Sequence, residues 1–285
     1  MGPWQWHSSR RTSQIVTFPY EENVSMKRRE FVAASCLAGL APLGALGQVA
    51  GEAGPAAKDL YELRLYHLPA GPKQQLFEDF AGKAAIPALN RIGIEPVGVF
   101  RMQEGDVSDL YVLLPHKSPE SFITLTQRLG ADAVFLEAGA EFLNAPFSDP
   151  AYQRYESSLM LAFDGHPQLT VASKEDTRVF QLRTYESHSE ERAQKKIEMF
   201  NTGGELEIFR RVGLPVVFFG QTLIGTKLPN LTYMVGFDDV AAMEAAWAGF
   251  RSDPGWLQLK DDPQYKDAVC NVTNILLRPA PCSQV

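Results

Sequence analysis

Tyr61-Glu62-Leu63-Arg64-Leu65-Tyr66 is the stretch that decides the fold, because it returns later in the chain as Phe180-Gln181-Leu182-Arg183-Thr184-Tyr185. Side chains alternate in character along each copy, as they do in a β-strand with one face against a core. The arginine and the tyrosine that follows it share the opposite face. The repetition predicts that two related units make up the folded part of the chain.

The surroundings of the two copies repeat as well. A helical stretch ends in Arg91-Ile92-Gly93 in one half and in Arg211-Val212-Gly213 in the other. Each half is predicted to run strand, helix, strand, strand, helix, strand, which is the ferredoxin-like order of an α+β fold. The predicted boundaries are residues 60–165 for the first repeat, 166–178 for a polar linker and 179–279 for the second repeat.

Breaks within the helices can be predicted from proline and glycine. Pro87 predicts a kink or a break in a helix expected over residues 73–91. Gly203-Gly204 is expected to interrupt a helix over residues 190–211. Asp253-Pro254-Gly255-Trp256 is predicted to turn the chain after the last helix.

Composition narrows the class of protein. The chain is 45% hydrophobic and 21% charged, with a formal net charge of -7, which is typical of a globular protein. A nucleic-acid-binding protein needs a net basic face, so that class is excluded. Cys270 and Cys282 could pair in an oxidising compartment, but Cys282 lies in a tail that is expected to be mobile, so the pairing stays open.

Residues 26–50 have the features of an export signal. Lys27-Arg28-Arg29 precedes a short apolar run that is too short to span a membrane, and small residues around Gly47 suit cleavage. The arginine pair resembles a twin-arginine signal, which predicts a periplasmic protein. Residues 1–25 resemble neither a leader nor a domain, and translation is expected to start at Met26 rather than Met1.

The two signature stretches and several segments of the second half resemble the NIPSNAP family. The resemblance is carried by Glu62-Leu63-Arg64-x-Tyr66, Gln181-Leu182-Arg183-Thr184-Tyr185, a hairpin over residues 220–233 with Leu228-Pro229-Asn230-Leu231-Thr232-Tyr233, and Trp247 followed by Asp253-Pro254-x-Trp256. The first half departs from the pattern: it lacks both tryptophans, and Pro115-His116-Lys117 replaces Gly236-Phe237-Asp238.

The resemblance implies a dimeric α+β barrel, with both units supplied here by one chain as a pseudo-dimer. The resemblance implies no particular reaction and assigns no catalytic residues. Related barrels include small monooxygenases, isomerases and haem-handling enzymes, a link that rests on fold alone.

The repeated Arg and Tyr pairs are the first candidates for chemistry. Arg64 with Tyr66, and Arg183 with Tyr185, could hold a carboxylate or phenolate, because a guanidinium presents a fork of donors. They face either the barrel interior or the helix-covered side. The alternative, which we favour, is that each arginine pairs with an acidic partner such as Glu62 and fixes the register.

Histidines and a glutamate follow the signature strands. His67 and His188 are expected at one rim of the sheet, where a histidine near Glu186 could act as a base or a metal ligand. No spacing typical of a metal site supports the second role, so we predict no metal and no cofactor, and favour solvated histidines. Trp247 and Trp256 are expected to be packing residues. The candidate pocket residues are Arg64, Tyr66, His67, Arg183, Tyr185, Glu186 and His188, with catalytic residues unassigned.

The leading hypothesis is an exported, cofactor-free protein that binds a small apolar molecule or a protein partner. The alternative is a cofactor-independent monooxygenase- or isomerase-like enzyme with a pocket in the barrel. A third is an inert assembly module with a filled barrel. We also expect no integral membrane span, and homodimerisation through open sheet edges.

Overall fold

The computed structural model describes residues 57–69, 71–104 and 108–285. The predicted export signal and residues 1–25 lie outside the described residues. Within them, no helix is long and apolar enough to cross a membrane.

The first repeat has the predicted order of elements. Its elements are β1 (Leu60–His67), α1 (Lys73–Phe80), a π-helical segment (Ala81–Ala85), α2 (Ile86–Arg91), β2 (Gly98–Met102), β3 (Leu110–His116), α3 (Pro119–Ile123), α4 (Leu125–Gly130), α5 (Ala133–Ala138), α6 (Ala140–Leu143) and β4 (Arg154–Ala162).

The second repeat follows the same plan. Its elements are β5 (Val179–Glu186), α7 (Glu190–Asn201), α8 (Glu205–Arg211), β6 (Val216–Ile224), β7 (Asn230–Phe237), α9 (Val240–Ser252), α10 (Pro254–Leu259), a short 3-10 turn (Pro263–Tyr265) and β8 (Asn271–Pro279).

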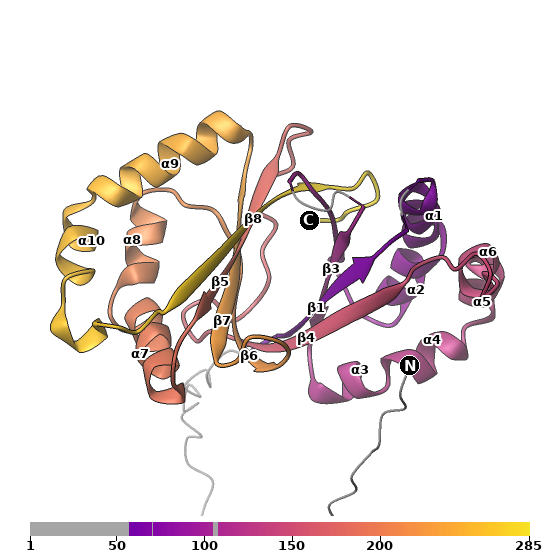
Figure 1. Cartoon of the computed structure of the whole chain (residues 1–285), viewed down its shortest axis with the longest axis horizontal. Coiled ribbons are helices and arrows are strands. Elements are labelled where there is room, and N and C mark those ends of the chain that lie inside the picture. Colours follow the sequence, from indigo (N-terminus) through magenta and orange to yellow (C-terminus); the bar gives the residue numbers. More distant parts are fainter. Residues whose placement is uncertain (1–56, 70, 105–107) are drawn as a thin grey trace, which may run out of the picture. The chain divides into compact units, whose positions relative to one another are not determined.

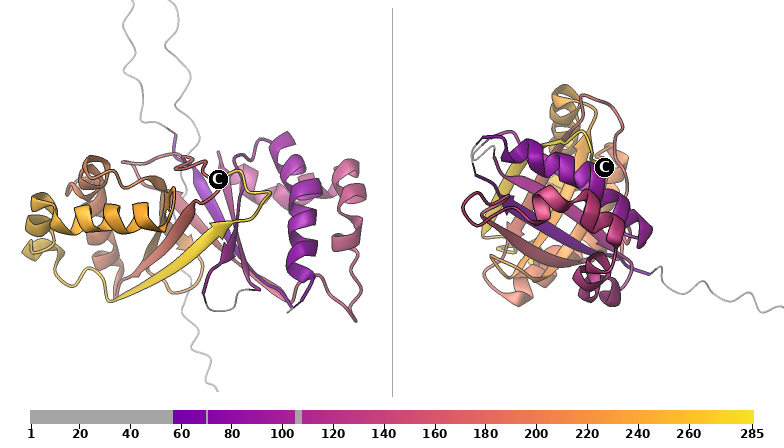
Figure 2. Two further views of the ribbon diagram at one scale, coloured as in Figure 1. Left: turned by 90° about the horizontal axis from the view of Figure 1, so that it is seen from above. Right: turned by 90° about the vertical axis from the view of Figure 1, so that its right-hand side faces the viewer.

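The strands form one closed antiparallel barrel in the order β1-β3-β2-β8-β5-β7-β6-β4. Each repeat contributes four neighbouring strands, and β2 with β8 and β4 with β6 join the two sets. Helices of the first repeat cover one side of the barrel and those of the second repeat the other (Figures 1 and 2). The predicted fold, two ferredoxin-like repeats that form an α+β barrel, is therefore confirmed.

Side chains from both repeats fill the barrel interior, and no helix of the described residues contributes to this cluster. Tyr61, the first residue of the signature, packs on Phe218 of the second repeat with ring centroids 5.0 Å apart. Phe180, the corresponding residue of the second copy, packs on Phe100 of the first repeat, also at 5.0 Å. Gly236 makes room for the Phe180 ring, because a Cβ there would lie 2.6 Å from Phe180 Cε1.

Three local predictions are refined by the structure. Pro87 neither breaks the helix nor ends it; the π-helical segment precedes it, and Pro87 occupies the first turn of α2, where its missing N–H is harmless. Gly204 does separate α7 from α8, with φ +99 before the first residue of α8. The chain does turn at Asp253, which ends α9, but a short helix that the sequence did not predict follows, because Asp253 caps α10.

The tail is not loose, contrary to the sequence-based expectation. Gln284 bonds to Val97 through both its backbone N–H and its side chain, and Ala280 and Val285 are buried. Cys270 and Cys282 are both free thiols.

Barrel closure leaves no free sheet edge among the described strands. The reason given for a homodimer is therefore wrong, and the dimer itself stays a prediction.

Candidate functional site

The Arg and Tyr pairs of both signature strands face the helices and not the barrel interior. Leu63 and Leu65 pack with the interior cluster, whereas Tyr66 packs with the helix-covered core of the first repeat. Tyr185 packs with the corresponding core of the second repeat. Alternation along the strand therefore places Arg64 and Arg183 in equivalent positions between sheet and helices.

In the first repeat this position is occupied by a closed ion pair. Arg64 Nε and Nη2 donate to the two carboxylate oxygens of Glu62 at 2.7 and 2.9 Å, and Ser157 Oγ donates to Glu62 at 2.8 Å. Burial alone raises the pKa of Glu62, but His116 at 3.5 Å and the hydrogen bonds from Arg64 and Ser157 outweigh it and lower the pKa to about 2. Arg64 and Tyr66 line a cavity of about 160 Å³ whose other walls are apolar.

In the second repeat Gln181 stands where the first has Glu62, so the strand supplies no carboxylate. Gln181 Oε1 accepts a hydrogen bond from Trp247 Nε1 at 2.5 Å. Arg183 makes no ion pair with any described residue. Its Nη2 donates to the Tyr185 hydroxyl at 3.3 Å, and its buried Nε has no partner among the described residues.

Aromatic rings surround the Arg183 guanidinium. Its Cζ lies 4.8 Å from the Trp247 ring centroid and 5.6 Å from that of Tyr185. The Tyr185 hydroxyl is 3.0 Å from that of Tyr233. Burial tends to lower the pKa of Arg183, but the oxygens of Tyr233 and Tyr185 have the larger combined effect and raise it, so the guanidinium is charged. Burial raises the pKa of Tyr233 well above its ordinary value, which makes its hydroxyl a donor rather than a base.

A buried ion pair lies beside this group. Lys196 Nζ on α7 is 2.6 Å from Glu205 Oε2 at the start of α8, and both side chains are at most 5% exposed. Burial raises the pKa of Glu205, which Lys196 and Arg183 partly offset. Lys196 also lies 4.4 Å from the centre of the Phe200 ring. Glu205 forms its ion pair with Lys196 and not with Arg183, although the charge of Arg183 also acts on it.

Arg183 lines a cavity of about 370 Å³ between the sheet and helices α8, α9 and α10. The lining is Gln181, Arg183, Tyr185, Glu205, Phe209, Tyr233, Trp247, Phe250, Arg251, Trp256 and Asn274. Arg251 and Asn274 are exposed, so the cavity can be reached from solvent. Its walls are aromatic, and its polar groups come from β5, β7, β8, α8 and α9, an arrangement typical of a ligand pocket.

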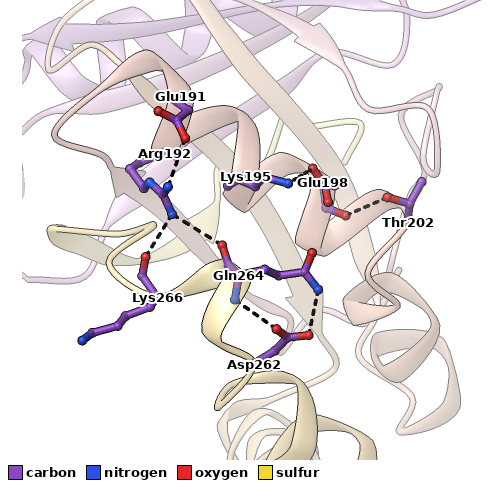
Figure 3. Close-up of polar contacts among 8 residues, drawn as sticks. All are labelled: Glu191, Arg192, Lys195, Glu198, Thr202, Asp262, Gln264 and Lys266. Carbon is purple, nitrogen blue, oxygen red and sulfur yellow. Dashed lines mark hydrogen bonds and ion pairs between the residues drawn. The ribbon is translucent and has the colours of Figure 1, made fainter.

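Contacts outside the cavity hold its helices in place. Arg192 Nη1 on α7 donates to the backbone oxygens of Gln264 and Lys266, which ties α7 to the segment before β8 (Figure 3). Asp253 accepts from Arg211 at 2.6 Å and caps α10, which fixes the corner between α9 and α10. These contacts therefore help to fix the positions of Trp247 on α9 and Trp256 on α10.

The other predicted site residues lie elsewhere. His67 is at the rim, 2.8 Å from Asp109 and 3.2 Å from Glu156. Glu186 accepts from Asn271 at 2.8 Å, and His188 is exposed. None of His67, Glu186 and His188 is in the lining of the two helix-side cavities. No group of metal-binding side chains occurs among the described residues.

The barrel interior also contains a cavity, of about 170 Å³. Its lining combines leucines with hydroxyl and amide side chains such as Thr184, Thr232 and Asn230. Thr184 and Thr232 hydrogen-bond each other at 2.9 Å, and Asn230 accepts from Thr222 at 2.6 Å. These four polar side chains therefore bond one another, whereas Arg183 Nε has no partner among the described residues.

Comparisons with known proteins agree with this architecture. A family model described as NIPSNAP matches residues 61–163 and 180–284. A comparison with curated proteins finds none that matches the chain.

Among solved structures, proteins assigned provisionally as monooxygenases are similar to the whole barrel. The one from Fusobacterium nucleatum has 10% identity and a TM-score of 0.54, covering 79% of this chain and 93% of that chain. The one from Lactobacillus acidophilus has 9% identity and a TM-score of 0.54, covering 78% and 94%. A NIPSNAP-like domain protein from Burkholderia xenovorans has 19% identity and a TM-score of 0.34, covering 38% and 89%. At these identities the first two show a shared fold.

The closed pair of the first repeat predicts a pH-dependent loss of stability in Glu62→Gln. The folded-state pKa of Glu62 is lowered to about 2, so its contribution is present above pH 4.5 and is lost as the pH falls toward 2. We expect the substitution to lower the free energy of unfolding by about 3 kcal/mol at pH 7 and by less at pH 3. Urea unfolding at both pH values measures this.

The control for that measurement is Glu137→Gln, the same change at an exposed position of α5, which should alter the free energy of unfolding by under ~0.5 kcal/mol. An equal loss at pH 7 and pH 3 for Glu62→Gln would mean that its charge does not stabilise the fold.

Proposed function

The chain belongs to the NIPSNAP family, and we propose that it binds a small, largely apolar organic molecule in the cavity of the second repeat. The observation that carries the proposal is the 370 Å³ cavity with aromatic walls and a cation, Arg183, that forms no ion pair with the described residues. A buried charge without a counter-ion is costly, and such groups persist where they serve a site. The first repeat, where the same position is closed by Glu62, serves as the structural scaffold.

We further propose that the protein is exported through a twin-arginine signal. The support is the sequence of residues 26–50 alone. Mass spectrometry of the native chain should find a mature N-terminus near Gly47. A native chain that still begins at Met1 or Met26 would contradict export by cleavage.

Two tryptophans in the cavity wall allow binding to be measured. In the full chain with Trp4→Phe and Trp6→Phe, emission comes from Trp247 and Trp256 only. We expect apolar acids or quinones to change this emission and raise the melting temperature. Asn274→Phe, which adds bulk to an exposed part of the lining, should raise Kd at least tenfold.

The matched control for the binding test is Asn144→Phe, the same change at an exposed position after α6, which should leave Kd unchanged. A panel of apolar acids and quinones that shifts neither emission nor melting temperature would refute ligand binding in this cavity.

A second candidate function is cofactor-independent oxygenation or isomerisation. Glu205 favours it, because a carboxylate of raised pKa that lines an aromatic cavity is suited to take a proton from a substrate. The likeness to provisionally assigned monooxygenases supports only the fold.

This candidate predicts that Glu205→Gln lowers kcat at least ~100-fold, measured as oxygen uptake or isomer formation with phenolic substrates. Glu207→Gln, at an exposed position of the same helix, should leave kcat unchanged. Turnover that survives Glu205→Gln would exclude Glu205 as the base.

A further inference from the structure

The two repeats differ at one decisive position. Glu62 and Gln181 are equivalent residues, two before the signature arginine. Glu62 binds Arg64 through both carboxylate oxygens. Gln181 instead accepts from Trp247 and gives Arg183 no counter-charge. The first repeat thus shows what this arginine binds when the strand supplies a partner, and the partner is a carboxylate.

We infer that the ligand of the second-repeat cavity is an organic carboxylate, and that its charged group replaces the missing side chain beside Arg183. The inference rests on the proposed binding in this cavity and assigns its ligand class. An arginine recognises a carboxylate through parallel N–H donors, and the apolar remainder of the ligand lies among the aromatic walls.

The charges around the cavity agree with an anionic ligand. Lys196 and Glu205 form a pair at 2.6 Å and cancel each other. Arg183 remains, and Arg251, exposed, is a second cation in the lining. Glu205 is the sole carboxylate of that lining. The bound carboxylate brings the cavity closer to neutrality.

Neutral donors add to the anion site. The Tyr185 hydroxyl is 3.3 Å from Arg183 Nη2 and 3.0 Å from the Tyr233 hydroxyl, so the guanidinium and two phenols lie together. The Trp247 face, 4.8 Å from Arg183 Cζ, stabilises the cation without neutralising it. The guanidinium and the two hydroxyl groups can all donate hydrogen bonds, as an anion site requires.

The test compares acids with their amides by calorimetry at pH 7.5. The probes are 2-naphthoate with 2-naphthamide and octanoate with octanamide, since the members of each pair have nearly the same size and differ in charge. Wild type should bind at least one acid with Kd at least tenfold lower than its amide.

Gln181→Glu is the decisive variant, because it installs the first repeat's carboxylate while keeping an acceptor for Trp247 and leaving Arg183 in place. It should raise Kd for the acid at least tenfold and leave Kd for the amide within twofold. Gln127→Glu, the same change at an exposed position of α4, should leave both values unchanged. Unaltered melting temperatures verify that each variant is folded.

The outcomes separate the two proposals. Equal affinity of acid and amide, or an acid affinity that Gln181→Glu does not reduce, would overturn the carboxylate assignment while leaving the binding cavity in place. Absence of binding by all four probes would overturn both.

Discussion

The rest of the structure depends on an exchange of aromatic rings between the repeats. Tyr61 of the first copy packs on Phe218 of the second repeat, and Phe180 of the second copy packs on Phe100 of the first. All four rings are buried in the barrel interior. The four-stranded sheet of each repeat has two edges, and one of its faces has no helices over it. The exchanged rings cover that face in both repeats, and the pairing of β2 with β8 and of β4 with β6 removes the edges. Each repeat therefore completes the core of the other.

Closing the barrel in this way fixes where a binding site can form. Interior positions of the signature strands pack in the shared core or line the interior cavity. The opposite face, toward the helices, carries the difference between Glu62 and Gln181. On that face the first repeat has the Glu62–Arg64 pair, and phenylalanines line a cavity of about 160 Å³. The second repeat has Gln181 and two tryptophans on α9 and α10 instead, and a larger cavity remains. The two copies thus share the fold and differ on the helix side of the signature strand.

The sequence predicted the duplicated plan because its alternation and punctuation are local signals. The repeated strand and Gly203-Gly204 report directly on backbone geometry. Period-two alternation separates two faces but cannot say which one meets the partner repeat, so the choice between barrel interior and helix side stayed open. The expected acidic partner was correct for Arg64, where Glu62 is two residues away, and wrong for Arg183, whose strand carries Gln181. Lys196 and Glu205 could not be predicted as site residues, since nothing local indicates that a lysine of α7 and the first residue of α8 are both buried.

Charged groups beside the second-repeat cavity have an energetic cost, and contacts around the cavity fix the elements that carry them. An unpaired guanidinium and a buried ion pair both disfavour folding unless neighbouring groups hold them in a favourable geometry. Arg192 ties α7 from outside, Asp253 fixes the corner that carries Trp256, and Gln181 fixes Trp247. Because Arg183 lies on strand β5, between β7 and β8, the barrel holds its backbone on both sides. A guanidinium fixed in this way is preorganised, so an anion of the proposed class would meet donors that need little rearrangement.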